Sequence, residues 1–237
     1  LLVAHDRDSF CRWEAAQILA VRKIGGYIDD YLHGRALVAD QDFIGVYRVV
    51  LAERNRLDPA YLGQLLTLPA ESYLAEFCEV IEVDAVHAAR EFVRRSLGEA
   101  LRDEFRSCWA ENLNHEPFRY DPELAGRRFL KNTCLAYLMR AGDREAESLC
   151  LEQYQQADNM TDEFAALHNL VHGGAATAAE VLGSFERKWR DDPLVMDKWL
   201  AVQASVPEPE TLARVKELLE HPAFVFKNPN RVRSLLG

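Results

Sequence analysis

The sequence lacks the short motifs by which many enzymes are recognised. It contains no Gly-x-Gly-x-x-Gly, no Walker A segment and no Gly-x-Ser-x-Gly. These motifs bind dinucleotides, cradle phosphates and hold the serine nucleophile of many hydrolases. No stretch reaches the roughly 20 consecutive apolar residues that a membrane span needs. The sequence therefore predicts neither a complete catalytic site nor contact with a membrane.

Cysteine and positive charge are both in short supply. The five cysteines lie far apart and include no Cys-x-x-Cys pair, which favours buried free thiols in a reducing compartment over metal knuckles or a disulfide framework. We therefore expect a cytoplasmic protein. Acidic residues outnumber basic ones by 38 to 28, for a net charge of −10. This balance argues against nucleic acid as a partner, because phosphate binding needs clustered Lys and Arg.

Helical periodicity dominates the chain. One apolar stripe runs through Val86, Ala89, Val93, Leu97 and on to Cys108 at intervals of three and four residues, which is typical of an amphipathic α-helix. Alternation of apolar and polar residues is almost absent, and 80–83 is the only weak strand candidate. The sequence therefore predicts an all-α fold.

Capping signals divide this pattern into helices. The pairs Asp58-Pro59, Asp121-Pro122 and Asp192-Pro193 each place an acceptor before a proline at the first helical position. Thr177 and Glu180 have capping-box spacing, and Gly34, Gly142 and Gly173 are placed to end helices. The expected helices span residues 9–33 (broken at Gly25-Gly26), 41–55, 58–66, 69–79, 84–113, 122–141, 143–157, 161–172, 177–190, 193–205, 209–220 and 229 onward.

Short connections between so many helices favour antiparallel pairs stacked as a curved α-solenoid, a superhelix of the HEAT or armadillo kind. We expect one helical domain over 1–237, with a possible subdivision at the irregular stretch 113–121. Both ends of the chain read as cut, so the sequence is interpreted as part of a longer protein whose domain continues past residue 237.

His168 and His172 form the most suggestive chemical pair. Two histidines four residues apart share a helix face, as zinc ligands do in His-Glu-x-x-His, but Asn169 stands where the glutamate would be. Phe164, Leu167 and Val171 place apolar residues beside both rings, so we interpret them as core or boundary residues and predict no metal site.

Carboxylates are abundant, and their spacing suggests surface roles. Asp29 and Asp30 are adjacent and should diverge on a helix. Asp158, Asp162 and Glu163 are expected to be solvated cap and first-turn charges.

The last segment differs from the rest. Asn228-Pro229 should cap a helix whose first two turns carry Arg231 and Arg233. Positive charge opposes the helix dipole there, and it is better tolerated beside an anion or a carboxylate. Two surface arginines are an equally good interpretation on local grounds.

Five segments together resemble one family. They are DSFCRWEAAQ at 8–17, RRFLKNTCLAYL at 127–138, DNMTDEFAAL at 158–167, LVMDKWLAVQA at 194–204 and NPNRVRSL at 228–235. The chain resembles, from residue 8 to 236, the C-terminal helical domain of bacterial aminopeptidase N, a family of zinc-dependent aminopeptidases of the gluzincin class.

The resemblance implies a function that the residues alone do not. It implies a non-catalytic α-helical superhelix that closes over the active site of a peptidase removing N-terminal residues from peptides. The family's His-Glu-x-x-His and Gly-x-Met-Glu-Asn motifs are absent here, so zinc and catalysis would belong to an upstream domain and this fragment would hold no cofactor. Arg233, with Arg231 and Asn230, would line the chamber on the side of the departing peptide.

Two other interpretations remain open at this stage. One is a free-standing α-solenoid scaffold for protein partners, and the other is a small metalloenzyme built on His168 and His172. The missing repeat consensus and the cut ends count against the scaffold, and metal titration would decide the second.

Overall fold

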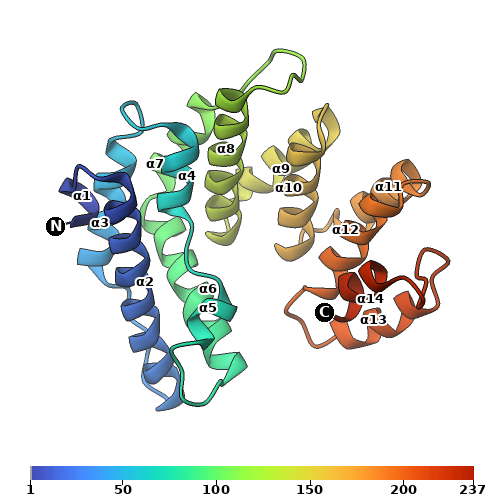
Figure 1. Ribbon diagram of the computed structural model, residues 1–237, viewed down its shortest axis with the longest axis horizontal. Helices are drawn as coiled ribbons and strands as arrows, with labels where there is room; N and C mark the ends of the chain where they lie inside the picture. Colours follow the sequence, from blue (N-terminus) through green and yellow to red (C-terminus); the bar gives the residue numbers. More distant parts are fainter. Residues whose placement is uncertain (1) are drawn as a thin grey trace. The chain divides into compact units, whose positions relative to one another are not determined.

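The computed structural model describes residues 2–237, and their side chains except that of Arg144. Every regular element in this part of the chain is an α-helix, and none of the described residues lies in a strand (Figure 1). The all-α prediction is confirmed. The weak strand candidate at 80–83 is wrong, because Val83 begins a helix and the residues before it are irregular.

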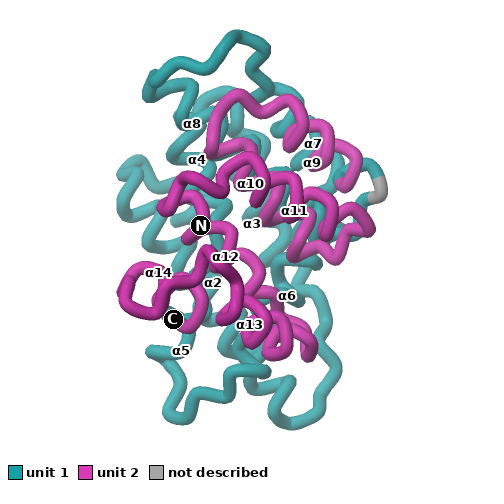
Figure 2. The backbone as a smooth tube through the Cα atoms, turned by 90° about the vertical axis from the view of Figure 1, so that its right-hand side faces the viewer, with its two compact units in different colours: residues 1–146 teal, residues 147–237 magenta. Residues whose placement is uncertain are grey.

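The chain divides into two compact units (Figure 2). The first ends at Ala146, and the second runs from Glu147 to Gly237. The first contains α1 (Leu2–His5), α2 (Ser9–Leu32), α3 (Gln41–Ala52), α4 (Pro59–Leu66), α5 (Glu71–Ala75), α6 (Val83–Ala100), α7 (Arg102–Glu111) and α8 (Pro122–Arg140). Helix α9 (Arg144–Gln156) begins at the end of the first unit. The second unit continues with α10 (Met160–His172), α11 (Ala178–Trp189), α12 (Pro193–Ala204), α13 (Thr211–Leu219) and α14 (Pro229–Leu236).

The boundary between the units lies after α8 and not at the irregular stretch 113–121. That stretch connects α7 to α8 inside the first unit, where these two helices pack against each other. Arg127 holds its beginning in place by donating hydrogen bonds to the carbonyl oxygens of Glu111, at 2.9 Å, and Leu113, at 3.2 Å.

The local start signals are confirmed at three helices. The side chains of Asp58, Asp121 and Asp192 accept hydrogen bonds from backbone N–H groups of the first turns of α4, α8 and α12, and each is followed by a proline. Gly34 and Gly142 adopt the left-handed conformation, both with φ of 65°.

Two predicted helix ends are wrong in detail. Gly173 keeps a right-handed φ of −84°, and Gly174 takes the left-handed position instead, with φ of 66°. Thr177 precedes α11 without a side-chain capping bond, because its backbone is already helical and its hydroxyl is buried without a partner among the described residues.

Packing overrides propensity in α2. The helix runs unbroken through Gly25 and Gly26, although each glycine costs roughly 1 kcal/mol in a helix. The flanking residues Ile24, Tyr27 and Ile28 are buried, and α2 packs along α6. Burial of those side chains contributes more than the glycines cost.

The long helix predicted over 84–113 is two helices. Leu101 interrupts it with φ of −121° and separates α6 from α7. The interruption frees the carbonyl oxygen of Ala100, which accepts a hydrogen bond from Arg48 at 3.2 Å. The hydrogen bond that this carbonyl oxygen loses at the interruption is thus replaced by one from a residue 52 positions away in the sequence.

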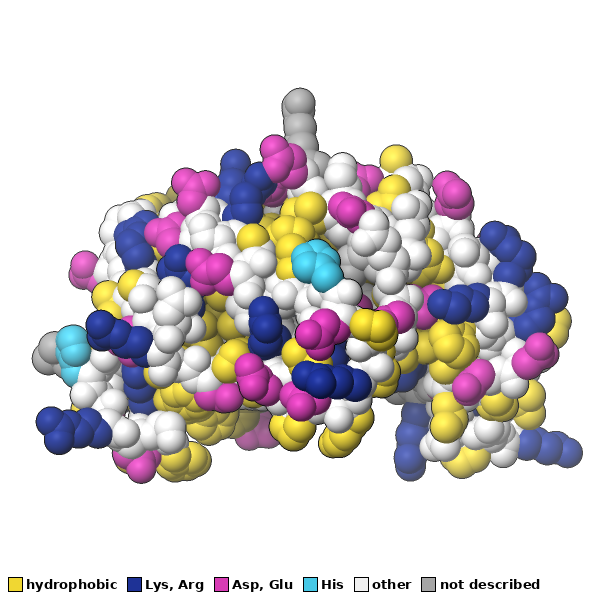
Figure 3. All heavy atoms as spheres, turned by 90° about the horizontal axis from the view of Figure 1, so that it is seen from above, with side chains coloured by type: hydrophobic (Ala, Val, Ile, Leu, Met, Phe, Trp, Pro, Cys, Tyr) yellow, Lys and Arg dark blue, Asp and Glu magenta, His cyan; other side chains and the backbone are white. Residues whose placement is uncertain are grey.

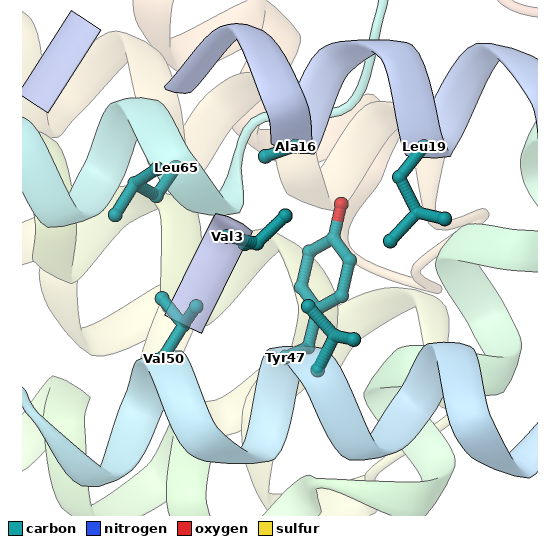
Figure 4. A pocket seen from close by; sticks show the side chains of 7 residues that line it. Val3, Ala16, Leu19, Tyr47, Val50 and Leu65 are labelled. Atoms are coloured by element: carbon teal, nitrogen blue, oxygen red, sulfur yellow. The ribbon is translucent and has the colours of Figure 1, made fainter. Parts of the chain in front are cut away.

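The core of the first unit forms where α8 crosses α4, α6 and α7. Phe105 and Tyr137 stack with ring centroids 4.4 Å apart, and the Tyr137 hydroxyl donates to the carbonyl oxygen of Leu66 at 2.6 Å. Beside this core, side chains from α1 to α4 enclose a small apolar space, in which the Tyr47 ring points from α3 toward Ala16 on α2 (Figure 4). This space has essentially no free volume and offers no ligand site.

The core of the second unit contains a carboxylate, contrary to expectation. Glu163 is only 2% exposed, and its Oε1 accepts hydrogen bonds from Lys188 at 2.8 Å and Trp189 at 3.2 Å. Asp162 is also buried. Both were predicted to be solvated first-turn charges, which was wrong because α11 packs over the start of α10.

Asp29 and Asp30 do not act independently. Arg35 forms ion pairs with both carboxylates, the one to Asp30 at 2.7 Å. The two side chains were expected to diverge, but Arg35 lies beyond the end of α2 and reaches both.

Candidate functional site

Helix α14 carries the residues singled out from the sequence. Asn228 precedes it, and its Oδ1 accepts hydrogen bonds from the backbone N–H groups of Asn230, at 3.0 Å, and Arg231, at 3.4 Å. Pro229 occupies the first helical position, where a missing N–H is harmless. The predicted capped helix is confirmed.

Arg231 is part of the packing between helices. It is only 5% exposed. Its Nη2 donates to the carbonyl oxygen of Pro193 at 3.1 Å, and its Nε lies 3.0 Å from Oδ1 of Asp197 on α12. Leu235, one turn later, is also buried. These residues form the face of α14 that packs against α12.

Arg233 lies on the opposite side of the helix, since two residues correspond to a rotation of about 200°. It and Asn230 are both exposed. No hydrogen bond or ion pair of the Arg233 side chain is found among the described residues, so its guanidinium is available to an external anion. Arg233 lies within the first two turns of α14, which begins at Pro229.

The histidine pair has the geometry of a packed pair and not of a metal site. The rings of His168 and His172 stack with centroids 4.0 Å apart. Nε2 of His172 lies 3.2 Å from the carbonyl oxygen of Val202. Oγ of Ser205 lies 3.2 Å from the same nitrogen, so the His172 ring is surrounded by hydrogen-bonding groups of α12 and its end. Over the described residues, no three His, Cys, Asp or Glu side chains gather into a possible metal site.

The cysteines offer no activated nucleophile in the second unit. Burial raises the pKa of the Cys150 thiol to about 12, so it is protonated at neutral pH and unreactive. All five cysteines are free thiols, and Cys108, Cys134 and Cys150 are buried as predicted. Cys11 is exposed and Cys78 half-buried, which corrects that prediction for these two.

The surface charges are mixed in sign. On the face seen in Figure 3, acidic and basic side chains are interspersed over most of the surface. Within residues 2–237, no helix is both long and apolar enough to cross a membrane.

One further cluster of charged residues was not predicted from the sequence. Arg90, Glu91 and Arg94 lie on α6, and Arg140, the last residue of α8, approaches the same glutamate. The spacing of three and four residues on α6 was a usable signal. No such signal indicated that Arg140, which is far away in the sequence, would lie beside Glu91.

In the second unit, helices pack against their immediate and next-but-one neighbours, as α12 does with α13 and α14. This is the packing of a helical-repeat protein. Residues 1–237 match the family described as "Domain of unknown function (DUF3458_C) ARM repeats", and the chain belongs to this family. The predicted α-solenoid class is confirmed.

The similar proteins of known identity are bacterial aminopeptidases. The chain is 34% identical over 236 residues to aminopeptidase N of Escherichia coli (strain K12), and 38% identical over 244 residues to that of Caulobacter vibrioides. Each match covers 100% of the chain but 27% of the relative, so the chain spans about a quarter of their length. The resemblance to the C-terminal domain of bacterial aminopeptidase N is confirmed.

The fold agrees with this relationship. The structure of Legionella pneumophila aminopeptidase A in complex with aspartic acid matches with a TM-score of 0.85 and 27% identity. The match covers 100% of the chain and 28% of that protein.

Proposed function

We propose that the chain is the non-catalytic domain of a cytoplasmic, zinc-dependent aminopeptidase N that removes N-terminal amino acids from peptides. The similarity of the whole chain to about a quarter of each aminopeptidase N carries this proposal. An upstream catalytic domain of the same polypeptide supplies the zinc and the chemistry. The helical domain closes the active-site chamber and contributes to access and binding of peptide substrates.

Within this proposal, Arg233 contacts the departing end of the peptide. Its exposed guanidinium makes no bond of its own in the described structure, and it offers five N–H donors in a planar fork suited to a carboxylate. Asn230 shares its side of α14 and lines the same part of the chamber. Arg231 is already engaged with Asp197 and Pro193, so its role is to hold α14 in position for the other two.

Substitution of Arg233 tests this assignment in the full-length enzyme. Arg233→Ala should raise KM for short peptides about fivefold to thirtyfold, because it removes a charge-assisted bond of roughly 1–2 kcal/mol at a partly solvated site. It should leave KM for an aminoacyl p-nitroanilide nearly unchanged, since that substrate has no carboxylate.

Arg187→Ala is the matched control, because Arg187 is an exposed arginine on α11 of the same unit. It should change neither constant. If Arg233→Ala weakens both substrates equally, Arg233 supports the fold and does not recognise the peptide.

The 237-residue chain alone should neither bind zinc tightly nor hydrolyse peptides. Two histidines with no third ligand among the described residues make a poor zinc site. Calorimetry should show no zinc binding tighter than about micromolar, and an aminoacyl p-nitroanilide assay with added zinc should show no turnover. A one-to-one zinc isotherm that disappears in His168→Ala would reverse this assignment.

A further inference from the structure

One carboxylate in the first unit is shared by three guanidinium groups. Oε1 of Glu91 lies 3.4 Å from Nη1 of Arg90 and 3.6 Å from Nη1 of Arg94. Its Oε2 lies 3.2 Å from Nε of Arg140. We call these four residues the Glu91 cluster. Because Arg140 draws on the same carboxylate, Glu91 does not fully neutralise the two arginines beside it on α6.

The cluster is largely removed from water. The side chains of Arg90, Glu91 and Arg94 are each 20% exposed, and that of Arg140 is 22% exposed. Burial lowers the pKa of Arg140; Glu91 opposes this shift, and the positive charges of Arg94 and Arg90 add to it. Charges at such sites interact more strongly than in open solvent. A further negative charge would therefore be stabilised here.

Donors for that charge are available on α6. Nε of Arg90 donates to the carbonyl oxygen of Pro69 at 2.8 Å, which fixes this side chain. Arg94 donates no hydrogen bond to any described residue, and its pair with Glu91 at 3.6 Å is longer than a hydrogen bond. The planar fork of Arg94 thus keeps its N–H groups for a ligand, and the side chain retains 20% of its exposure to solvent.

We propose that the Glu91 cluster is a binding site for a carboxylate ligand, held by the fork of Arg94 with support from Arg90. Guanidinium forks bind planar carboxylates through two parallel N–H groups. A monoanionic carboxylate compensates the surplus positive charge on α6 without introducing a second negative charge of its own. The source of the group is either the C-terminus of a peptide or a free carboxylic acid.

This site is separate from the role proposed for Arg233, which belongs to the second unit, and it does not depend on aminopeptidase activity. Binding can be measured on the 237-residue chain without turnover. A failure here would leave the aminopeptidase assignment intact, and a failure of that assignment would leave this site intact.

The test uses N-acetyl-trialanine, its C-terminal amide and propionate, a small monocarboxylate, in NMR or calorimetric titrations at low salt. The free acid should bind at least about tenfold more tightly than the amide, because the amide lacks the charge for the fork. Propionate binding as tightly as the peptide assigns the site to free acids, and weaker binding of propionate assigns it to peptide C-termini. Equal binding of acid and amide would overturn the proposal, as would binding of inorganic phosphate without binding of either carboxylate.

Variants of α6 decide whether the binding is local. Arg94→Ala should abolish the preference for the acid, and Arg94→Lys should lose most of it, since lysine keeps the charge without the fork. Arg95→Ala, at an exposed position beside it, removes the same charge and should bind like the unmodified chain. An equal loss in Arg95→Ala would mean general electrostatic attraction and would contradict the proposal. If thermal melting shows Arg94→Ala to be unfolded, Arg94→Lys and Arg94→Gln decide the question.

Discussion

Arg231→Met should lower the free energy of unfolding of the second unit by about 3 kcal/mol, because it breaks a buried ion pair by removing one partner. The Asp197 side chain is only 16% exposed and would keep its charge without a counter-ion. The carbonyl oxygen of Pro193 would also lose a donor. Methionine fills most of the volume, so the loss reports on charge and hydrogen bonding more than on a cavity.

Urea unfolding followed by circular dichroism measures this effect. Arg233→Met is the control, since it removes the same charge from an exposed position and should change stability by about 0.5 kcal/mol or less. The double variant Arg231→Met with Asp197→Leu should recover much of the loss, because neither charge is then left unpaired. Equal effects of the two single variants would contradict the structural role of Arg231.

The different roles of Arg231, which is buried, and Arg233, which is exposed, could be predicted only in part. The rotation of 100° per residue already places Arg231 and Arg233 on opposite sides of a helix. The sequence does not say which side faces the protein, since an arginine can lie on either. The answer comes from Asp197, which α12 brings to within 3.0 Å of Arg231.

The features predicted correctly are those set within a few residues. Asp58, Asp121 and Asp192 cap helices because an aspartate side chain reaches the N–H groups two or three residues ahead wherever the chain goes next. Gly34 and Gly142 end helices because few other residues adopt a positive φ at low cost.

The features missed depend on partners remote in sequence. Glu163 is buried because Lys188 and Trp189 come to it from the next helix. Leu101 can interrupt a helix because Arg48 donates a hydrogen bond to the carbonyl oxygen of Ala100, which the interruption leaves free. Gly25 was expected to break α2. It stays helical because the neighbouring residues of α2 are packed against α6. In each case a local preference was outweighed by a contact that periodicity does not encode.

The crossing of α6 and α8 gives the second large expected effect. Gly98→Val should destabilise the first unit by about 3 kcal/mol through overpacking. A Cβ at residue 98 would lie 2.5 Å from the carbonyl oxygen of Tyr137 and 3.2 Å from Cβ of Ala141. That oxygen is backbone and accepts the hydrogen bond from the N–H of Ala141 at 3.0 Å, so it cannot move without disturbing the end of α8.

Gly98→Ala should show the same sign with a smaller loss, because the clash outweighs the gain of about 1 kcal/mol in helix propensity. Gly25→Ala supplies the comparison, since a Cβ there meets nothing within 4 Å and the position is also inside a helix. It should stabilise the protein by about 0.5–1 kcal/mol. Thermal and urea unfolding of both variants therefore test whether the change in the free energy of unfolding has opposite signs at the two positions. A difference in sign is easily distinguished from experimental error. If Gly98→Ala proved as stabilising as Gly25→Ala, the two helices would be able to separate at little cost. Gly98 would then not set the spacing of α6 and α8, the two helices that carry the Glu91 cluster.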